Sequence, residues 1–172
     1  MGVLTIEEMK KKIEYKHVLL DANALIEAHH SSVKFTDLIQ FLLDAHCQPV
    51  IMPFVEFEIF RNCFQPEFRE ALERYLAVWH CFSLPLGDTG KLLQESLTIA
   101  QYCAARKLAT PSLTDCFIGA LLKRHKNELY LLTRNHKDFP PPLFVRELTW
   151  SVDMPRDVVT FGFYRFDESQ LI

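Results

Sequence analysis

The stretch HVLLDANALIEA, His17 to Ala28, places one carboxylate between two apolar segments of different spacing. The first segment, His17 to Leu20, is a short continuous apolar run, which indicates a buried strand. After Asp21 the apolar residues recur at helical spacing, and we expect a helix to about Ala28. Asp21 therefore lies where a strand ends and a helix begins. Ligands of open α/β sheets bind outside these strand ends, so Asp21 is a candidate functional residue.

The same alternation of strand and helix continues along the chain. The spacing predicts further strands at 48–52, 129–133, 144–149 and 158–163, and helices at 5–15, 33–45, 53–63, 66–80, 88–107 and 115–125. Residues 81–86 are expected to form a short strand or an extended link. Short apolar strands separated by helices predict a three-layer α/β/α fold with a mainly parallel central sheet. We expect one domain over 1–172, with a core at about 17–150, a short N-terminal helix and a C-terminal β extension.

Composition narrows the class of protein. Of 172 residues, 49% are hydrophobic and 24% are charged, which is typical of a globular protein and not of a disordered one. No apolar run approaches the ~20 residues of a membrane span, and the charged start lacks the apolar stretch of a signal peptide. We therefore expect a cytoplasmic protein without a membrane partner. The five cysteines form no CxxC pair, so they indicate neither a zinc site nor a disulfide framework.

Four carboxylates stand near the ends of predicted strands or at the starts of predicted helices. Asp21 follows the first strand, and Glu58 lies in the helix that begins after the second. Asp115 falls in the first turn of its helix, and Asp138 lies in the loop after the 129–133 strand. Each residue alone is also explained as a helix cap, a surface acid or a turn residue. Their joint placement favours one shared pocket at an edge of the sheet.

Carboxylates that share a cleft repel one another, so their joint ionised state is costly without a cation. Mg²⁺ and Mn²⁺ prefer oxygen ligands and bridge to substrate phosphate. Such a metal lowers the pKa of a bound water that attacks phosphorus in line, and a carboxylate that is free of the metal can take its proton. The pattern therefore predicts that Asp21, Glu58, Asp115 and Asp138 bind Mg²⁺ or Mn²⁺ and cut phosphodiester bonds.

Four segments of the chain resemble, in order, the four motifs of PIN-domain nucleases. They are VLLDANALIEA at 18–28, VIMPFVEFEIFRN at 50–62, SLTDCFIGALLKRH at 112–125 and LYLLTRNHKDF at 129–139. The resemblance implies a three-layer α/β/α fold, Mg²⁺- or Mn²⁺-dependent endonuclease activity and single-stranded RNA as the substrate. Many small members of that family are toxins of toxin–antitoxin pairs, and dimers are common among them. The resemblance thus implies an antitoxin protein and a second copy of the chain as further partners.

The resemblance transfers to some positions more directly than to others. In the second segment both Glu56 and Glu58 are available, and Glu58 is favoured because an apolar pair and Arg61 follow it. In the fourth segment Asn135 stands where some members have Asp, which leaves Asp138 to supply the last carboxylate.

Several polar and basic residues would support the site. Asn23, Thr133 and Asn135 match supporting polar positions, although Asn23 is also explained as a helix cap and Thr133 as a β-branched strand residue. Arg61 and Arg134 are candidates for binding the RNA backbone, with ordinary surface positions as the alternative.

Two other functions compete with the nuclease. A catalytically weak or inactive nucleic-acid- or protein-binding module is favoured by Asn135. A metal-dependent phosphotransferase or phosphatase is disfavoured, because Asn23 replaces the second Asp that phosphoaspartate enzymes carry after the first strand.

Overall fold

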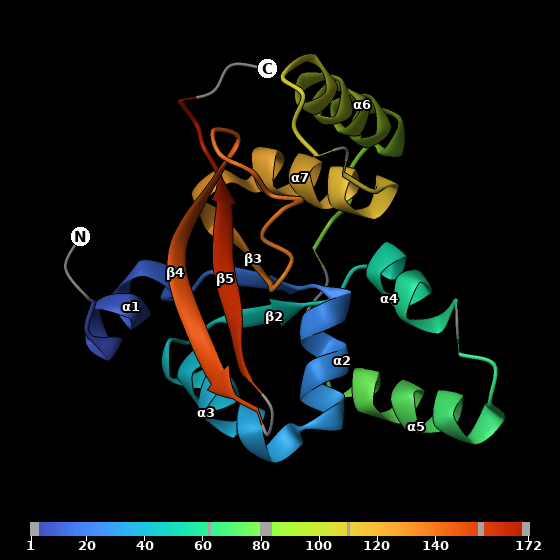
Figure 1. Cartoon of the computed structure of the whole chain (residues 1–172), viewed down its shortest axis with the longest axis vertical. Coiled ribbons are helices and arrows are strands. Elements are labelled where there is room, and N and C mark those ends of the chain that lie inside the picture. Colours follow the sequence, from blue (N-terminus) through green and yellow to red (C-terminus); the bar gives the residue numbers. More distant parts are fainter. Residues whose placement is uncertain (1–3, 62, 80–83, 110, 155–156, 170–172) are drawn as a thin grey trace.

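The computed structural model describes residues 4–61, 63–79, 84–109, 111–154 and 157–169. The helices and strands within these ranges are drawn in Figure 1. In chain order they are α1 (Ile6–Ile13), β1 (His17–Leu20), α2 (Ala22–His30), α3 (Ser32–Asp44), β2 (Gln48–Val50), α4 (Pro53–Phe60), α5 (Pro66–Ala77), α6 (Thr89–Ala105), α7 (Leu113–His125), the 3-10 turn η1 (Lys126–Glu128), β3 (Leu129–Thr133), β4 (Phe144–Asp153) and β5 (Val158–Phe166).

The strands form one open sheet in the order β2-β1-β3-β5-β4. β1 pairs in parallel with β2 on one side and with β3 on the other, in a register that places Leu20 beside Leu132. After β3 the chain forms β4 at the edge of the sheet, and β4 does not pair with β3. β5 then returns between β3 and β4 and pairs antiparallel with both. The result is a mixed α/β protein with a parallel half and an antiparallel half.

The prediction of a mainly parallel sheet was wrong. Most paired positions belong to the two antiparallel ladders, and the longest of them joins β4 to β5. The physical reason is the length of the connections. Strands joined by a short connection, as β4 and β5 are, pair antiparallel, whereas a parallel neighbour needs a crossover of about a dozen residues or more.

Local sequence explains why the parallel half forms. β3 is buried along its whole length and β1 along its last three residues, as expected for strands covered on both faces. The helices that cross between them begin at clear signals. Asp21 caps α2, Pro53 occupies the first turn of α4, and Asp88 caps α6 by accepting from the backbone N–H of Lys91 at 3.1 Å.

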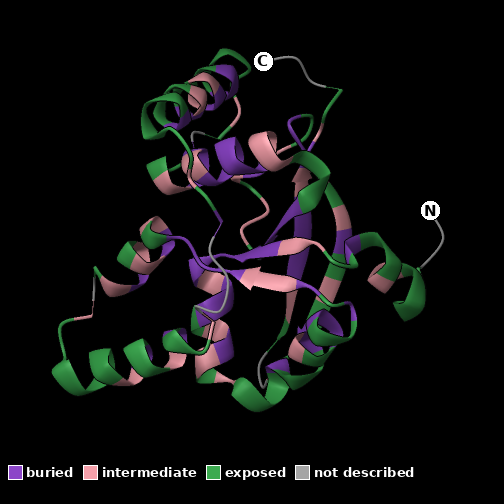
Figure 2. Cartoon of the chain, turned by 180° about the vertical axis from the view of Figure 1, so that it is seen from behind, coloured by how far each residue is buried: buried purple, intermediate pink, exposed green. Residues whose placement is uncertain are grey.

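Helices contact the sheet through aromatic and small side chains. From α3, Phe41 packs on Trp150 of β4 and Phe163 of β5, with ring centroids 4.7 and 6.1 Å apart. From α7, Gly119 lies against Phe144 of β4, where an added Cβ would stand 3.0 Å from the ring. α6 packs on α7, and α4 and α5 project to one side of the molecule (Figure 1). Buried residues gather on the central strands and the inner faces of α2 and α7, whereas α5 is mostly exposed (Figure 2).

Several boundaries differ from those expected. β4 and β5 continue to Asp153 and Phe166, well past the predicted ends, because their hairpin is paired along its whole length. α4 ends at Phe60, before its predicted end at residue 63. Of the expected link at 81–86, residues 81–83 lie outside the described residues, and Leu84–Leu86 belong to no helix or strand. Within the described part of the chain, no helix combines the length and the apolar character needed to cross a membrane.

Candidate active site

Asp21 stands at the point where β1 gives way to α2. Its backbone N–H donates to the carbonyl of Leu132 at 3.2 Å, which extends the β1–β3 ladder by one bond. Its side chain caps α2, because Oδ1 accepts from the backbone N–H of Ala22 at 2.7 Å. Only 4% of the residue is exposed. The carboxylate is therefore fixed at the carboxyl end of a central strand, as the sequence predicted.

Asn23 and Thr133 hold the other oxygen of Asp21. The buried Thr133 hydroxyl donates to Asp21 Oδ2 at 2.6 Å, and the Asn23 amide donates to the same oxygen. Thr133 ends β3, the neighbour of β1, so the parallel register alone brings Thr133 beside Asp21. The Asn23 side chain also accepts from the backbone N–H of Arg134 at 3.0 Å. Two of the three supporting residues named from the sequence, Asn23 and Thr133, thus contact Asp21.

The loop after β3 carries the fourth predicted acid. The backbone N–H of Asn135 donates to Thr133 Oγ1 at 2.9 Å, and the Asn135 side-chain amide donates to Asp138. Asn135 therefore joins Asp138 to the network around Asp21. Where an Asp at position 135 would repel Asp138, the amide instead donates a hydrogen bond to it.

Asp115 is held by the start of α7. The helix begins at Leu113, earlier than predicted, so Ser112 is its N-cap and Asp115 the third helical residue. Ser112 donates to Asp115 Oδ2 from its hydroxyl at 2.6 Å and from its backbone N–H at 3.0 Å, and the Asp115 N–H donates to Ser112 Oγ at 3.1 Å. This reciprocal capping box aims the carboxyl group and leaves Oδ1 without a protein donor among the described residues.

Glu58 lies on α4 and is half-buried. Its nearest cation is Arg61, one turn later on the same helix, with Nη2 3.8 Å from Oε1. Glu56, the other candidate on α4, is also half-buried. Glu58 lies close enough to Asp21 and Asp115 for their charges to interact: the charge of Glu58 raises the pKa of Asp21, and the charge of Asp115 raises the pKa of Glu58.

Charges within the cluster affect the ionisation of Asp21, Glu58 and Asp115. Burial raises the pKa of Asp115 to about 6. The charges of Asp138 and Asp21 also raise it, whereas the hydrogen bonds from Ser112 lower it. Burial likewise raises the pKa of Asp21, and the charge of Glu58 raises it further. The pKa of Glu58 is raised by burial and then by the charge of Asp115, whereas Arg61 lowers it. Carboxylates that destabilise one another's charged forms form a cluster that favours a cation.

The geometry bears on how a divalent metal would be held. Across the described residues, no three His, Cys, Asp or Glu side chains already stand close enough to surround one ion. Mg²⁺ often binds through one or two carboxylates and keeps several waters, so a preformed cage is not required. The donor set consists of carboxylate oxygens, and Asp115 Oδ1 and Asp138 Oδ1 have no protein donor within the described residues. The chemistry of these residues therefore fits Mg²⁺ or Mn²⁺.

The two predicted RNA-binding arginines have protein partners. Arg61 is exposed and lies by Glu58. Arg134 is also exposed, and its guanidinium pairs with Glu27 on α2. Basic residues also occupy the last turn of α7. Among them Arg124 has a structural role, because it pairs with Glu95 and donates to the carbonyls of Leu86 and Asp88.

Two contributors to the site region were not singled out as such from the sequence. Ser112 orients Asp115; the capping-box spacing of these two residues was the available signal. Glu27 pairs with Arg134 across more than a hundred positions, and no local pattern indicates that contact.

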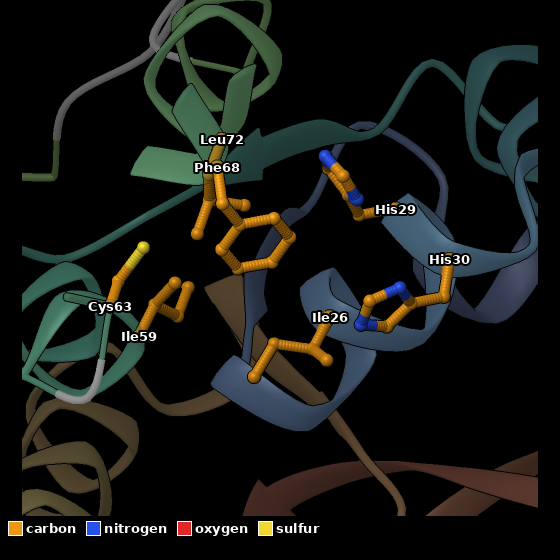
Figure 3. Close-up of a pocket in the computed structure, with 7 residues that line it drawn as sticks. All are labelled: Ile26, His29, His30, Ile59, Cys63, Phe68 and Leu72. Atoms are coloured by element: carbon orange, nitrogen blue, oxygen red, sulfur yellow. The ribbon is translucent and has the colours of Figure 1, made fainter. Parts of the chain in front are cut away.

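An apolar pocket of about 180 Å³ opens between α2, α4 and α5 (Figure 3). It is lined by Ile26 of α2, the helix that Asp21 caps, and by Ile59 of α4, the helix that carries Glu58. α5 contributes Phe68 and Leu72. His29 and His30 lie along one side of it, with the His29 ring 6.0 Å and edge-on from Phe68 (Figure 3). The two histidines at the end of α2 thus pack on aromatic rings of α5.

Comparisons with known proteins identify no relative. No family model, no curated protein and no solved structure matches the chain. The likeness to PIN-domain nucleases therefore rests on the four motifs and on the positions that they occupy in this fold.

Proposed function

We propose that this protein is a metal-dependent endoribonuclease of the PIN-domain type, which cleaves single-stranded RNA with a metal-activated water. One observation carries the proposal. Asp21, Glu58, Asp115 and Asp138 come from four separate segments, and each is electrostatically coupled to at least one of the others. Burying uncompensated acids is unfavourable, and clusters of this kind are characteristic of functional sites.

The arrangement of helices and strands supports the same family. β1 and β3 are parallel neighbours, and Asp21 and the loop that bears Asp138 follow their carboxyl ends. α3 contacts the hairpin strands through Phe41, and α7 contacts them through Gly119. We propose that these helices form the two outer layers of a three-layer α/β/α fold around the mixed sheet.

Each residue has a distinct part in the proposed reaction. A bound Mg²⁺ or Mn²⁺ would neutralise the acids, polarise the scissile phosphate and acidify an attacking water. Asp21, fixed by Thr133 and Asn23, is the rigid ligand. Asp115 and Asp138 each offer an oxygen to which no described residue donates. Glu58 is more exposed than Asp21 and Asp115. We therefore assign it the proton transfer from water.

An antitoxin protein and a second copy of the chain are further proposed partners, on the strength of the motif resemblance alone. A catalytically weak nucleic-acid-binding role is the second candidate function. It is favoured by Asn135, which donates to Asp138 where a carboxylate would have added a metal ligand.

Cleavage of labelled single-stranded RNA in Mg²⁺ or Mn²⁺ tests the proposal. Wild type should cut, EDTA should abolish cutting, and Asp21→Asn should lose about a hundredfold or more in rate, the scale on which an electrostatic group in a catalytic site contributes. Glu56→Gln is the matched control for Glu58→Gln and should retain activity. RNA binding with no metal-dependent cleavage by wild type would favour the second candidate and reject the nuclease.

A further inference from the structure

A separate pocket of about 420 Å³ lies between the loop after β3 and the C-terminal hairpin. It is formed by His136 and Phe139 of the loop and by Arg146, Tyr164 and Asp167 of the hairpin region, together with neighbouring prolines and apolar residues. Its volume is within the range of about 300–1,000 Å³ that small-molecule sites have. The acidic cluster does not use any of these residues.

One end of this pocket is cationic. Arg146 lines it, and none of the ion pairs within the described ranges involves Arg146. His136 stands nearby, with Nδ1 2.7 Å from the Tyr164 hydroxyl. Gly162 makes room for this arrangement, because an added Cβ would collide with the Tyr164 ring and stand 2.9 Å from Arg146 Cδ. A β-bulge directly after Arg146 shifts the ladder register, and bulges are a common means of redirecting side chains at sites.

The floor of the pocket is aromatic. Phe139 packs against Tyr164 at 5.9 Å between centroids and against Phe144 at 5.3 Å. All three rings are buried within the protein, at 1 to 4% exposure. The apolar surface that the pocket offers to a ligand therefore comes mainly from Pro141 and Pro142, which line it and are exposed. A flat heteroaromatic ring is the kind of group that packs against such a wall.

The other end of the pocket is acidic. Arg146 pairs with Tyr164 across the hairpin, and Asp167 lies three residues beyond Tyr164 on the extended chain. At about 3.3 Å per residue, the backbone positions of Tyr164 and Asp167 are about 10 Å apart. Asp167 is fixed by two bonds from Ser169, from the backbone N–H at 3.0 Å and from the hydroxyl at 2.7 Å. The pocket therefore presents a cation, an apolar wall and a carboxylate.

We propose that this pocket binds one nucleotide, with its phosphate at Arg146 and His136, its base against the wall formed by Pro141 and Pro142 and an exocyclic amino group directed to Asp167. The carboxylate makes the site selective, because cytosine and adenine carry such an amino donor and uracil does not. The ligand is a nucleoside phosphate, either free in solution or part of an RNA strand.

The RNA source rests on the proposed function. Asn135 and Asp138 face the acidic cluster through the Thr133 network, whereas His136 and Phe139, on the same loop, line the pocket. A strand cut at the acids would thus place a neighbouring nucleotide in the pocket, because the same short loop contributes residues to both.

Calorimetric titration of the full-length protein with CMP and UMP, in EDTA, tests the pocket itself. CMP should bind more tightly than UMP, and Arg146→Gln should weaken CMP binding about tenfold, as expected for a lost charge-assisted hydrogen bond. Asp167→Asn should reduce the preference for CMP. Arg69→Gln, an exposed arginine of α5, is the matched control. Thermal unfolding of each variant checks that the fold is retained.

Anisotropy of a labelled single-stranded RNA, again in EDTA, distinguishes the two sources. If RNA occupies the pocket, Arg146→Gln lowers the affinity and reduces the slope of log K against log salt by about 0.7, the value for one lost phosphate contact. CMP binding that depends on Arg146, with unchanged RNA affinity, identifies a free-nucleotide site. The proposal is overturned if Arg146→Gln and Arg69→Gln are equal in CMP binding, RNA affinity and salt slope. A failure of the nuclease proposal is distinct, since it removes metal-dependent cleavage and leaves Arg146-dependent CMP binding.

Discussion

Replacing Asp115 by Asn should stabilise the metal-free protein at neutral pH. Asp115 is 9% exposed, and its pKa is raised to about 6 from a model-compound value of 3.8, first by burial and then by the charges of Asp138 and Asp21. An acid whose pKa is higher in the folded state favours folding in its protonated form. That contribution is fully present below the unfolded pKa of 3.8 and is lost as the pH rises through about 6.

The size of the effect follows from this shift. A rise of about two pKa units corresponds to about 3 kcal/mol lost between acid and neutral pH, as an upper bound. Asn keeps an acceptor for the two Ser112 donors but accepts more weakly than a carboxylate, which removes part of the gain. We therefore expect Asp115→Asn to raise the free energy of unfolding by about 1–2 kcal/mol at pH 7.5.

Urea unfolding in EDTA at pH 7.5 and pH 4.5 measures this. With a slope of about 1–3 kcal/mol per molar urea, the midpoint at pH 7.5 should rise by roughly 0.5–1 M. At pH 4.5 folded wild type is largely protonated at position 115, so the two midpoints should lie much closer together than at pH 7.5. Asp37→Asn, at an exposed position of α3, is the matched control and should change neither midpoint. A variant that is less stable than wild type at pH 7.5, or that gains equally at both pH values, would refute the reasoning about charge.

Two further predictions concern the same cluster. Mg²⁺ at tenfold above its dissociation constant should stabilise wild type by about 1.4 kcal/mol at pH 7.5, and Asp115→Asn should lose most of this gain, as measured by thermal unfolding with and without EDTA. An equal stabilisation of both proteins by Mg²⁺ would place the metal elsewhere. Thr133→Val should destabilise the protein by about 1.5–3 kcal/mol, because it removes a buried hydroxyl that donates to the Asp21 carboxylate at 2.6 Å. Thr149→Val, on an exposed position of β4, is its control in the same urea assay, and equal midpoints for the two variants would contradict the assigned role of the Thr133 hydroxyl.

Local sequence was sufficient for the elements that position Asp21 and Asp115. A continuous apolar run followed by Asp specified β1 and the cap of α2, because a strand end and a helix start are set by hydrogen bonds between close neighbours. The capping-box spacing of Ser112 and Asp115 has the same local origin, although the predicted helix start was two residues late.

The long-range arrangement was beyond local sequence. Spacing indicated strands at 144–149 and 158–163, but whether the second of them would lie at the edge or beside β3 depends on packing among distant side chains. The insertion of β5 between β3 and β4 made the sheet mixed, and it also brought Arg146 and Tyr164 beside the loop that follows β3.

The opening stretch, His17 to Ala28, shows the same division. The sequence by itself determined that Asp21 ends a strand and caps a helix, since both are properties of adjacent residues. Only the tertiary structure decided that Thr133 would donate to the Asp21 carboxylate. It also decided that the charge of Glu58 would raise the pKa of Asp21 and that the charge of Asp21 would raise the pKa of Asp115. Those contacts join segments that are far apart in the chain, and pairing across such distances is selected by burial of the whole core, which no local pattern encodes.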